Sequence, residues 1–131
     1  MKIQDLRLGN LVLFNGEQYL VSGLILPSFN GEGSINLLKG DKSITVLLKD
    51  IQPIIISESI LKERLQFEED DNYGFPILSN KALRMDAYES GEGWHLHIDD
   101  SDYCTTFSGV IRYLHELQNT FYLSTREELS I

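Results

Sequence analysis

Short apolar runs separated by polar, glycine-containing turns fill the first part of the chain. The run Leu11–Phe14 is followed by Asn15 and Gly16, a pair that favours a tight hairpin turn because both residues tolerate positive φ. The segment 19–26 then predicts the returning strand, in which Gly23 indicates a bulge. Two more strand-like runs flank the turn sequence KGDK. The pattern predicts a small, curled antiparallel sheet.

The pattern changes after Pro53, which ends the strand-rich region. The segment 57–67 predicts a short helix, with Ser57 as its N-cap and Leu61 and Leu65 on its apolar side. The segments 73–79, 82–90 and 93–100 then return to strand-like patterns. In the middle one, apolar and polar residues alternate, which is typical of a sheet with one face in water. A second antiparallel sheet is therefore expected.

The most strongly patterned segment is 111–129. Apolar residues recur at the helical spacing i, i+4, i+7 and i+11, in the order Val110, Leu114, Leu117 and Phe121. Ser108 is the expected cap of this amphipathic helix. Thr125–Glu128 resembles a capping box, but so little chain follows it that we expect a frayed turn or a short edge segment.

Composition narrows the possible functions. The 131 residues carry 20 acidic and 11 basic side chains, for a formal charge of -9. Such a chain is a poor ligand for a phosphate backbone, which is bound through clustered Lys and Arg. No apolar run approaches the roughly 20 residues that span a bilayer, and the first residues do not resemble a signal peptide. With the single cysteine Cys104, these features predict a cytoplasmic protein without an internal disulfide.

The sequence WHLHIDD contains the most suggestive chemistry. On a strand, His95, His97 and Asp99 project from one face, where two imidazoles and a carboxylate are candidate ligands for zinc or iron. The alternative, which we favour, is that these residues line the wet face of a sheet whose other face is buried. The chain contains the residue types for a nucleophilic Cys104 activated by a histidine, but no sequence context marks such a site, and a structural cysteine is favoured. The acidic run Glu68–Asn72 favours a solvated turn, because contiguous acids lack the ligand spacing of a calcium loop.

The polar side of the C-terminal helix has two interpretations. Tyrosine and histidine at the border of an apolar stripe ordinarily bury a ring and leave a polar tip in water. The alternative is a surface for a protein partner, to which two tyrosines and an amide pair are suited. The residues of this candidate interaction surface are Tyr113, His115, Glu116, Gln118, Asn119 and Tyr122.

Two stretches at the ends of the sequence carry a family resemblance. They contain Asp5, Leu6, Gly9, Asn10, Val12 and Gly16, and then Tyr113, His115, Leu117, Gln118, Asn119, Tyr122, Glu127, Glu128 and Leu129. They resemble a family of small proteins from anaerobic gut bacteria (Bacteroides-type) and their phages. In that family an R-x-G-N-x-V start and a Y-V-H-x-L-Q-N-x-Y helix, followed by G-E-E-L, bracket a variable middle. Leu114 stands where valine is common, and Arg126 stands where glycine is usual, which argues against a left-handed helix cap there. The resemblance implies a phage or mobile-element context and no particular chemistry.

Together these patterns predict one α+β domain over residues 1–131, with a possible seam at 53–57. The expected order is an SH3-like curled antiparallel sheet (1–53), a short helix, a second antiparallel sheet and the C-terminal amphipathic helix. The leading functional hypothesis is a non-enzymatic protein-binding module of phage or mobile-element origin, which uses no cofactor and contacts neither nucleic acid nor membrane directly. Homo-oligomers remain possible through an edge strand. The alternatives are an acidic decoy that occupies a nucleic-acid-binding protein, and a metal-dependent enzyme that uses the HxHxD strand.

Overall fold

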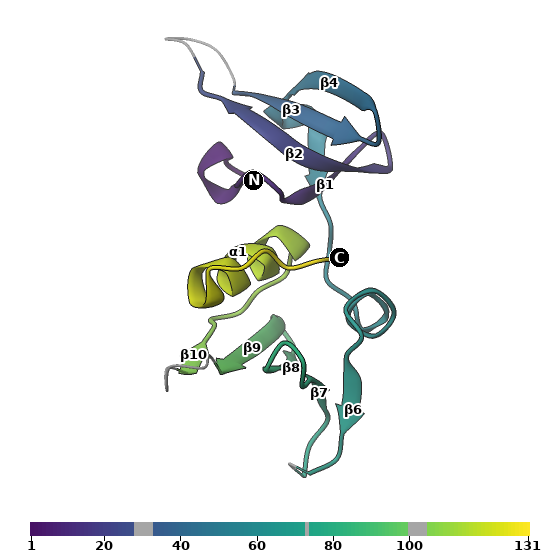
Figure 1. Cartoon of the computed structure of the whole chain (residues 1–131), viewed down its shortest axis with the longest axis vertical. Coiled ribbons are helices and arrows are strands. Elements are labelled where there is room, and N and C mark those ends of the chain that lie inside the picture. Colours follow the sequence, from purple (N-terminus) through teal and green to yellow (C-terminus); the bar gives the residue numbers. More distant parts are fainter. Residues whose placement is uncertain (28–32, 73, 100–104) are drawn as a thin grey trace. The chain divides into compact units, whose positions relative to one another are not determined.

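The structure is a computed structural model that describes residues 1–27, 33–72, 74–99 and 105–131 (Figure 1). Within these residues the chain has the α+β fold that the sequence predicts, with two five-stranded antiparallel sheets and a helix near the C-terminus. Most of the loop predicted at 27–34 and the residue Cys104 lie outside the described residues. None of the described helices is long and apolar enough to cross a membrane.

The chain divides into two compact units, each of which holds one sheet. Unit 1 consists of Met1–Ile54 and Tyr113–Asn119, and unit 2 consists of Ile55–Arg112 and Thr120–Ile131. The boundary in the first part of the chain therefore follows Ile54, one residue after the proline that ends the strand-rich region.

Unit 1 is built on a meander of four strands that a fifth strand completes. The strands are β1 (Leu11–Phe14), β2 (Glu17–Ile25), β3 (Ser34–Lys39), β4 (Lys42–Leu47) and β5 (Ile51–Pro53). They lie in the order β4-β3-β2-β1-β5, and a 3-10 turn, η2 (Leu48–Asp50), leads into β5. Because β5 pairs with β1, both sides of β1 are hydrogen-bonded. The SH3-like description of this sheet stays a prediction.

The turns of this sheet follow the glycine signals in the sequence. Asn15 and Gly16 adopt φ values of 51° and 77°, as the predicted hairpin requires. The pairing of β2 with β3 shifts its register between Val21 and Gly23, which confirms the predicted bulge. A Cβ at Gly23 would lie 2.7 Å from the Nδ2 atom of Asn36, so the absent side chain lets the two strands approach.

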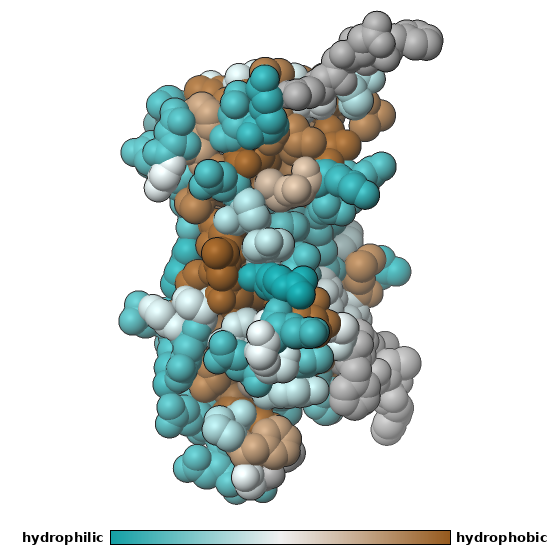
Figure 2. All heavy atoms as spheres, turned by 180° about the vertical axis from the view of Figure 1, so that it is seen from behind, coloured by the Kyte–Doolittle hydropathy of each residue, from teal (hydrophilic) through white to brown (hydrophobic). Residues whose placement is uncertain are grey.

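The core of unit 1 is formed by the inward-facing residues of this sheet and of the segment before it. These residues are Leu6, Val12, Tyr19, Val21, Ile35, Leu37 and Ile51. The alternation of buried and exposed residues along β3 is the period-two pattern of a strand that covers a core on one face. Figure 2 shows that apolar residues, in brown, also reach the surface among polar ones, as is usual for a folded chain.

Unit 2 carries the second sheet. Its strands are β6 (Glu68–Asp70), β7 (Ile77–Asn80), β8 (Met85–Ser90), β9 (Gly93–Asp99) and β10 (Thr105–Phe107), in the order β10-β9-β8-β7-β6. The predicted alternation is confirmed in β8 and β9. Met85, Ala87, Leu96 and Ile98 are buried, and the residues between them are at least partly exposed.

The acidic run at 68–72 was predicted as a solvated turn, and this prediction is wrong for its first three residues. Glu68–Asp70 form β6, which pairs antiparallel with β7. An edge strand tolerates charged side chains because one of its sides remains open to water, and Phe67, 2 % exposed, anchors the strand to the core. Backbone pairing with β7 therefore outweighs the low strand propensity of Glu and Asp.

The predicted short helix of unit 2 is a single wide turn. The Ser57 hydroxyl accepts a hydrogen bond from the Ile60 amide (3.2 Å), which confirms the expected cap. The turn η3 (Ile60–Arg64) is of the π type, since the Leu65 amide donates to the Ile60 carbonyl. It ends at Arg64, and Gln66 just beyond it has a φ of 59°, so the turn is shorter than the predicted 57–67.

The C-terminal helix α1 spans Leu114–Thr125 and buries the predicted stripe of Leu114, Leu117 and Phe121. Ser108 does not cap it, contrary to prediction, because its hydroxyl accepts the Leu96 amide at 2.8 Å. The Glu116 carboxylate instead accepts the Tyr113 amide (3.1 Å) at the helix start.

The end of α1 differs from the expectation based on Arg126. This residue has a φ of 62°, so it occupies the left-handed conformation that glycine usually supplies, and its amide donates to the Tyr122 carbonyl at 2.7 Å. The capping-box-like sequence Thr125–Glu128 begins no further helix, in agreement with the expectation. The Thr125 hydroxyl belongs to the last turn of α1, where it donates to the Phe121 carbonyl and accepts the Glu127 amide.

Candidate functional site

The interaction surface predicted on the C-terminal helix is only partly at the surface. His115 and Gln118 are 2 % and 3 % exposed, so the expectation that they face a partner is corrected by their burial. Tyr113, Glu116, Asn119 and Tyr122 are half-buried. The sequence suggested a surface because two tyrosines and an amide pair are suited to a protein contact, and amides are mostly exposed residues.

Gln118 acts as a substitute for a neighbouring strand. Its Oε1 atom accepts the Leu11 amide at 2.9 Å, and its Nε2 atom donates to the Gly9 carbonyl at 3.0 Å. One side-chain amide thus satisfies a backbone donor and a backbone acceptor at the start of β1. Buried backbone groups need such partners, because an unsatisfied one costs about 1–3 kcal/mol.

Asn119 extends the same network. Its Oδ1 atom accepts hydrogen bonds from Asn10 Nδ2 (2.9 Å) and Arg7 Nε (3.3 Å), and its Nδ2 atom donates to the Asp5 carbonyl (2.9 Å). Asn10 is fully buried, and its Oδ1 atom accepts the Arg7 amide at 2.7 Å. We call Asn10, Gln118 and Asn119 the amide latch.

The amide latch joins the two stretches that carry the family resemblance. Arg7, Gly9 and Asn10 of the first stretch bond to Gln118 and Asn119 of the second, and all five of these residues belong to unit 1. These polar residues therefore have a structural role in this chain. The sequence alone placed them in two separate motifs, because no local pattern shows that they are neighbours.

His115 is buried beside this latch in unit 1. Its ring stacks on Tyr113, with centroids 5.7 Å apart and planes at 8°, and its Nδ1 atom has no hydrogen-bond partner among the described residues. Burial lowers the pKa of His115, while the carboxylates of Glu116 and Asp5 act in the opposite direction. Burial, the larger effect, favours the neutral form of the ring.

The histidines of β9 lie on the wet face of the second sheet, as the favoured interpretation predicted. His95 stacks on Tyr88 (4.9 Å, 9°) and its Nε2 atom lies 3.2 Å from the Ser90 hydroxyl. His97 Nδ1 lies 3.6 Å from a carboxylate oxygen of Asp86. Asp99 is exposed at the end of the strand. Among the described residues, no three His, Cys, Asp or Glu side chains converge as a metal site would require, so the HxHxD candidate is not assembled.

A hollow of about 540 Å³ in unit 2 is the site that the sequence did not reveal. This volume lies within the roughly 300–1,000 Å³ typical of ligand sites. Its apolar lining comes from the segment before β7, from β7 itself and from the paired strands β8 and β9. These residues are Phe75, Pro76, Ile77, Leu78, Ala87 and Trp94. We call this cavity the unit 2 hollow.

The floor of the unit 2 hollow is buried, and its edge is exposed. Leu78, Ala87 and Trp94 are 6 % exposed or less, whereas Phe75 is 54 % exposed. The Phe75 ring meets Tyr88 edge-on, with centroids 6.2 Å apart and planes at 82°. A large apolar ring held at the edge of a cavity is a feature of binding sites, because its exposure costs free energy in the absence of a ligand.

Carboxylates surround this apolar floor. They belong to Glu58, Glu69, Asp70, Asp71 and Glu89, and no Lys or Arg is among the described residues that line the unit 2 hollow. Glu58 lies just before η3. Glu69 and Asp70 belong to β6, and Asp71 follows it. Glu89 is paired with Trp94 across β8 and β9. The hollow is therefore strongly acidic.

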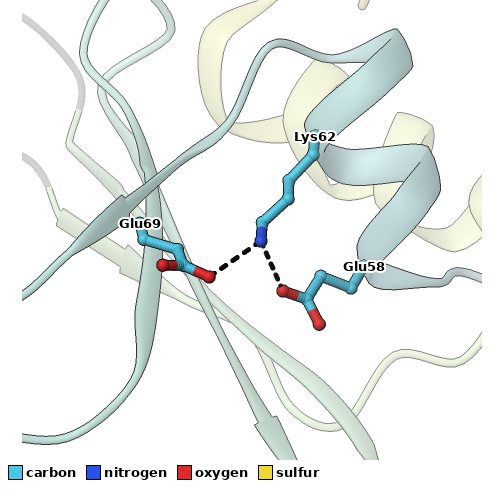
Figure 3. Close-up of polar contacts among 3 residues, drawn as sticks. All are labelled: Glu58, Lys62 and Glu69. Carbon is cyan, nitrogen blue, oxygen red and sulfur yellow. Dashed lines mark hydrogen bonds and ion pairs between the residues drawn. The ribbon is translucent and has the colours of Figure 1, made fainter.

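Two of these carboxylates share one cation. Lys62 Nζ lies 2.6 Å from Glu58 Oε1 and 2.8 Å from Glu69 Oε1, and Figure 3 shows the ammonium group between them. The hydrogen bonds that Lys62 donates to Glu58 and Glu69 raise the pKa of Lys62, and its contact with Glu69 lowers the pKa of Glu69. This triad ties η3 to β6 and leaves one net negative charge.

The other three carboxylates have no internal cation. Asp70 accepts hydrogen bonds from Asn72 and from the Ser79 hydroxyl. In the described part of the chain, no hydrogen bond or ion pair engages the carboxylates of Asp71 and Glu89. The unit 2 hollow thus combines an apolar floor with uncompensated negative charge, which suits a ligand that is both apolar and cationic.

The sequence contained signals for this site, but they were distributed over 37 positions from Glu58 to Trp94. An acidic run followed by the apolar pair Phe75 and Pro76, and a lone tryptophan opposite an acid, acquire meaning only when the strands are paired. Comparison with known protein families, curated proteins and solved structures finds no match for this chain.

Proposed function

We propose that this chain is a non-enzymatic protein-binding module that receives its partner in the unit 2 hollow. The observation that carries the proposal is the exposed Phe75 ring at the edge of a cavity with a buried apolar floor. Aromatic side chains that fill or border pockets dominate the energetics of protein interfaces.

The helix surface inferred from the sequence becomes less suitable for this role. Gln118 and Asn119 are engaged in the amide latch, and Glu116 caps the start of α1. These side chains would have to break internal hydrogen bonds in order to bind a partner. A partner can bind in the unit 2 hollow at Phe75, Asp71 and Glu89 without breaking such hydrogen bonds.

A phage or mobile-element origin is part of the proposal. It is supported by the resemblance of the two terminal stretches, whose residues form the amide latch. A module of this origin acts by occupying a protein of its host. The charge of -9 favours, as a second candidate, a decoy that covers the basic surface of a nucleic-acid-binding protein.

The proposal is tested by affinity capture with matched variants. The tagged full chain, Phe75→Ala and Leu123→Ala are each incubated with lysate of cells that carry the gene, and bound proteins are quantified. Leu123 is 67 % exposed and does not line the unit 2 hollow, so its truncation removes a similar amount of exposed apolar surface elsewhere. We expect a stoichiometric partner that Leu123→Ala retains and Phe75→Ala loses.

A partner that Phe75→Ala binds normally would refute the role of the unit 2 hollow. Addition of duplex DNA to the captured complex separates the two candidates. A decoy is displaced by DNA, since both ligands compete for one basic surface, and a module that binds elsewhere on its partner is not.

A further inference from the structure

We propose that the unit 2 hollow recognises an arginine side chain presented by an apolar segment of the partner protein. This inference rests on the proposed function and specifies its ligand. It follows from two independent properties of the hollow, its charge and its aromatic edge.

The charge of the hollow calls for a cation. Five carboxylates line it, and Lys62 compensates only for one of the two that it contacts, so the cluster retains four net negative charges. Asp71 and Glu89 are the carboxylates that no described residue engages. A cation that enters there gains charge-assisted hydrogen bonds without displacing an internal partner.

The aromatic edge selects arginine over lysine. A guanidinium group is planar, is weakly hydrated, stacks on aromatic rings and offers a fork of donors to carboxylates. Phe75 provides an exposed ring, and Glu89 lies directly across from Trp94 in the pairing of β8 with β9. An ammonium group forms ion pairs with the same carboxylates but lacks the planar face that such rings favour.

The apolar floor explains why the arginine belongs to an apolar segment. Leu78, Ala87 and Trp94 give the hollow a surface that a free guanidinium ion cannot cover. Apolar residues beside the arginine fill that surface, and the segment then contributes hydrophobic burial as well as charge.

The chain contains its own reporter for this binding. Trp94 is the single tryptophan of the sequence and lines the hollow, so its indole N–H gives one NMR signal from the site. We would titrate the full-length protein with three synthetic peptides that differ only at the central position of Ac-Ala-Leu-X-Leu-Ala-NH2. The position X is arginine, lysine or citrulline, which has the shape of arginine without its charge.

The expected result is a shift of the Trp94 indole signal that saturates with the arginine peptide. The citrulline peptide should bind about tenfold more weakly or worse, as expected for the loss of a hydrogen bond to a charged group. The lysine peptide should fall between them. Glu89→Gln should weaken arginine binding about tenfold, whereas Glu127→Gln, which removes the same charge from an exposed position outside the hollow, should not.

Equal affinity for the arginine and citrulline peptides, or an unmoved Trp94 signal, would overturn the inference. Glu89 is exposed, so loss of fold is not expected to confuse the result. The two proposals also fail separately. If capture of a host protein depends on Phe75 but citrulline binds as well as arginine, the module stands and the arginine inference falls. If capture is independent of Phe75, the module itself falls.

Discussion

Replacement of Gln118 by leucine tests whether the amide latch holds unit 1 together. The change keeps the approximate volume of the side chain and leaves the Leu11 amide and the Gly9 carbonyl without their partners. The first of these groups is buried and the second part-buried, so their loss of partners costs at most about 2–6 kcal/mol. Burial of the leucine offsets about 1.5–3 kcal/mol of this. We expect a net loss centred near 2 kcal/mol, which is a large share of the roughly 5–15 kcal/mol that stabilises an ordinary domain.

Two measurements check this expectation. Urea denaturation followed by circular dichroism gives the change in the free energy of unfolding, and hydrogen exchange reports the Leu11 amide directly. A loss of 2 kcal/mol corresponds to exchange that is roughly 30-fold faster. Leu123→Ala, on the exposed side of the same helix, is the control and should change stability by less than about 0.5 kcal/mol. If Gln118→Leu behaved like this control, the latch would be an incidental contact and the reasoning would fail.

Three further predictions concern other parts of the molecule. Burial lowers the pKa of His115 below its usual value near 6.5, against the carboxylates of Glu116 and Asp5, so on acidification the unfolded chain binds a proton at this residue before the folded chain does. The free energy of unfolding should therefore be full above about pH 6.5 and should fall as the pH drops below it. His115→Phe should remove this part of the pH dependence of the urea midpoint. Gly93→Ala should destabilise unit 2 by about 1–3 kcal/mol, because Gly93 has a φ of 150° and a Cβ there would lie 2.6 Å from the Ile111 carbonyl oxygen. The control is Gly91→Ala, whose added Cβ would have no atom within 4 Å, and it should leave the melting temperature nearly unchanged. Lys62→Gln should tighten binding of the arginine peptide, because it frees the carboxylates of Glu58 and Glu69. Lys42→Gln makes the same charge change in unit 1 and should leave the affinity unchanged in the same titration. Weaker binding by Lys62→Gln would contradict this prediction and would show that the triad maintains the shape of the hollow.

The features that the sequence predicted are those set by neighbouring residues. The Asn15-Gly16 turn, the bulge at Gly23 and the alternation along β8 and β9 depend on local backbone freedom and on a period of two. The buried stripe of α1 likewise follows from helical spacing.

The errors occur where a distant partner decides the structure. Glu68–Asp70 are a strand because β7 offers a pairing edge, and Ser108 is not a cap because its hydroxyl accepts the Leu96 amide and α1 begins only at Leu114. The unit 2 hollow belongs to the same class. Its acids and its aromatic residues become one site only through the pairing of four strands.

The amide latch has a consequence for the order in which the chain folds. The start of β1 leaves the ribosome early, yet its partner Gln118 lies 107 residues further along the chain. At synthesis rates of about 5–20 residues per second, Leu11 exists for roughly 5–20 s before that partner is made. During translation the N-terminal sheet therefore lacks the hydrogen-bond partner of the Leu11 amide and the Gly9 carbonyl. Its completion is a late event, and a nascent chain stalled before α1 should be recognised by chaperones or proteases as unfinished.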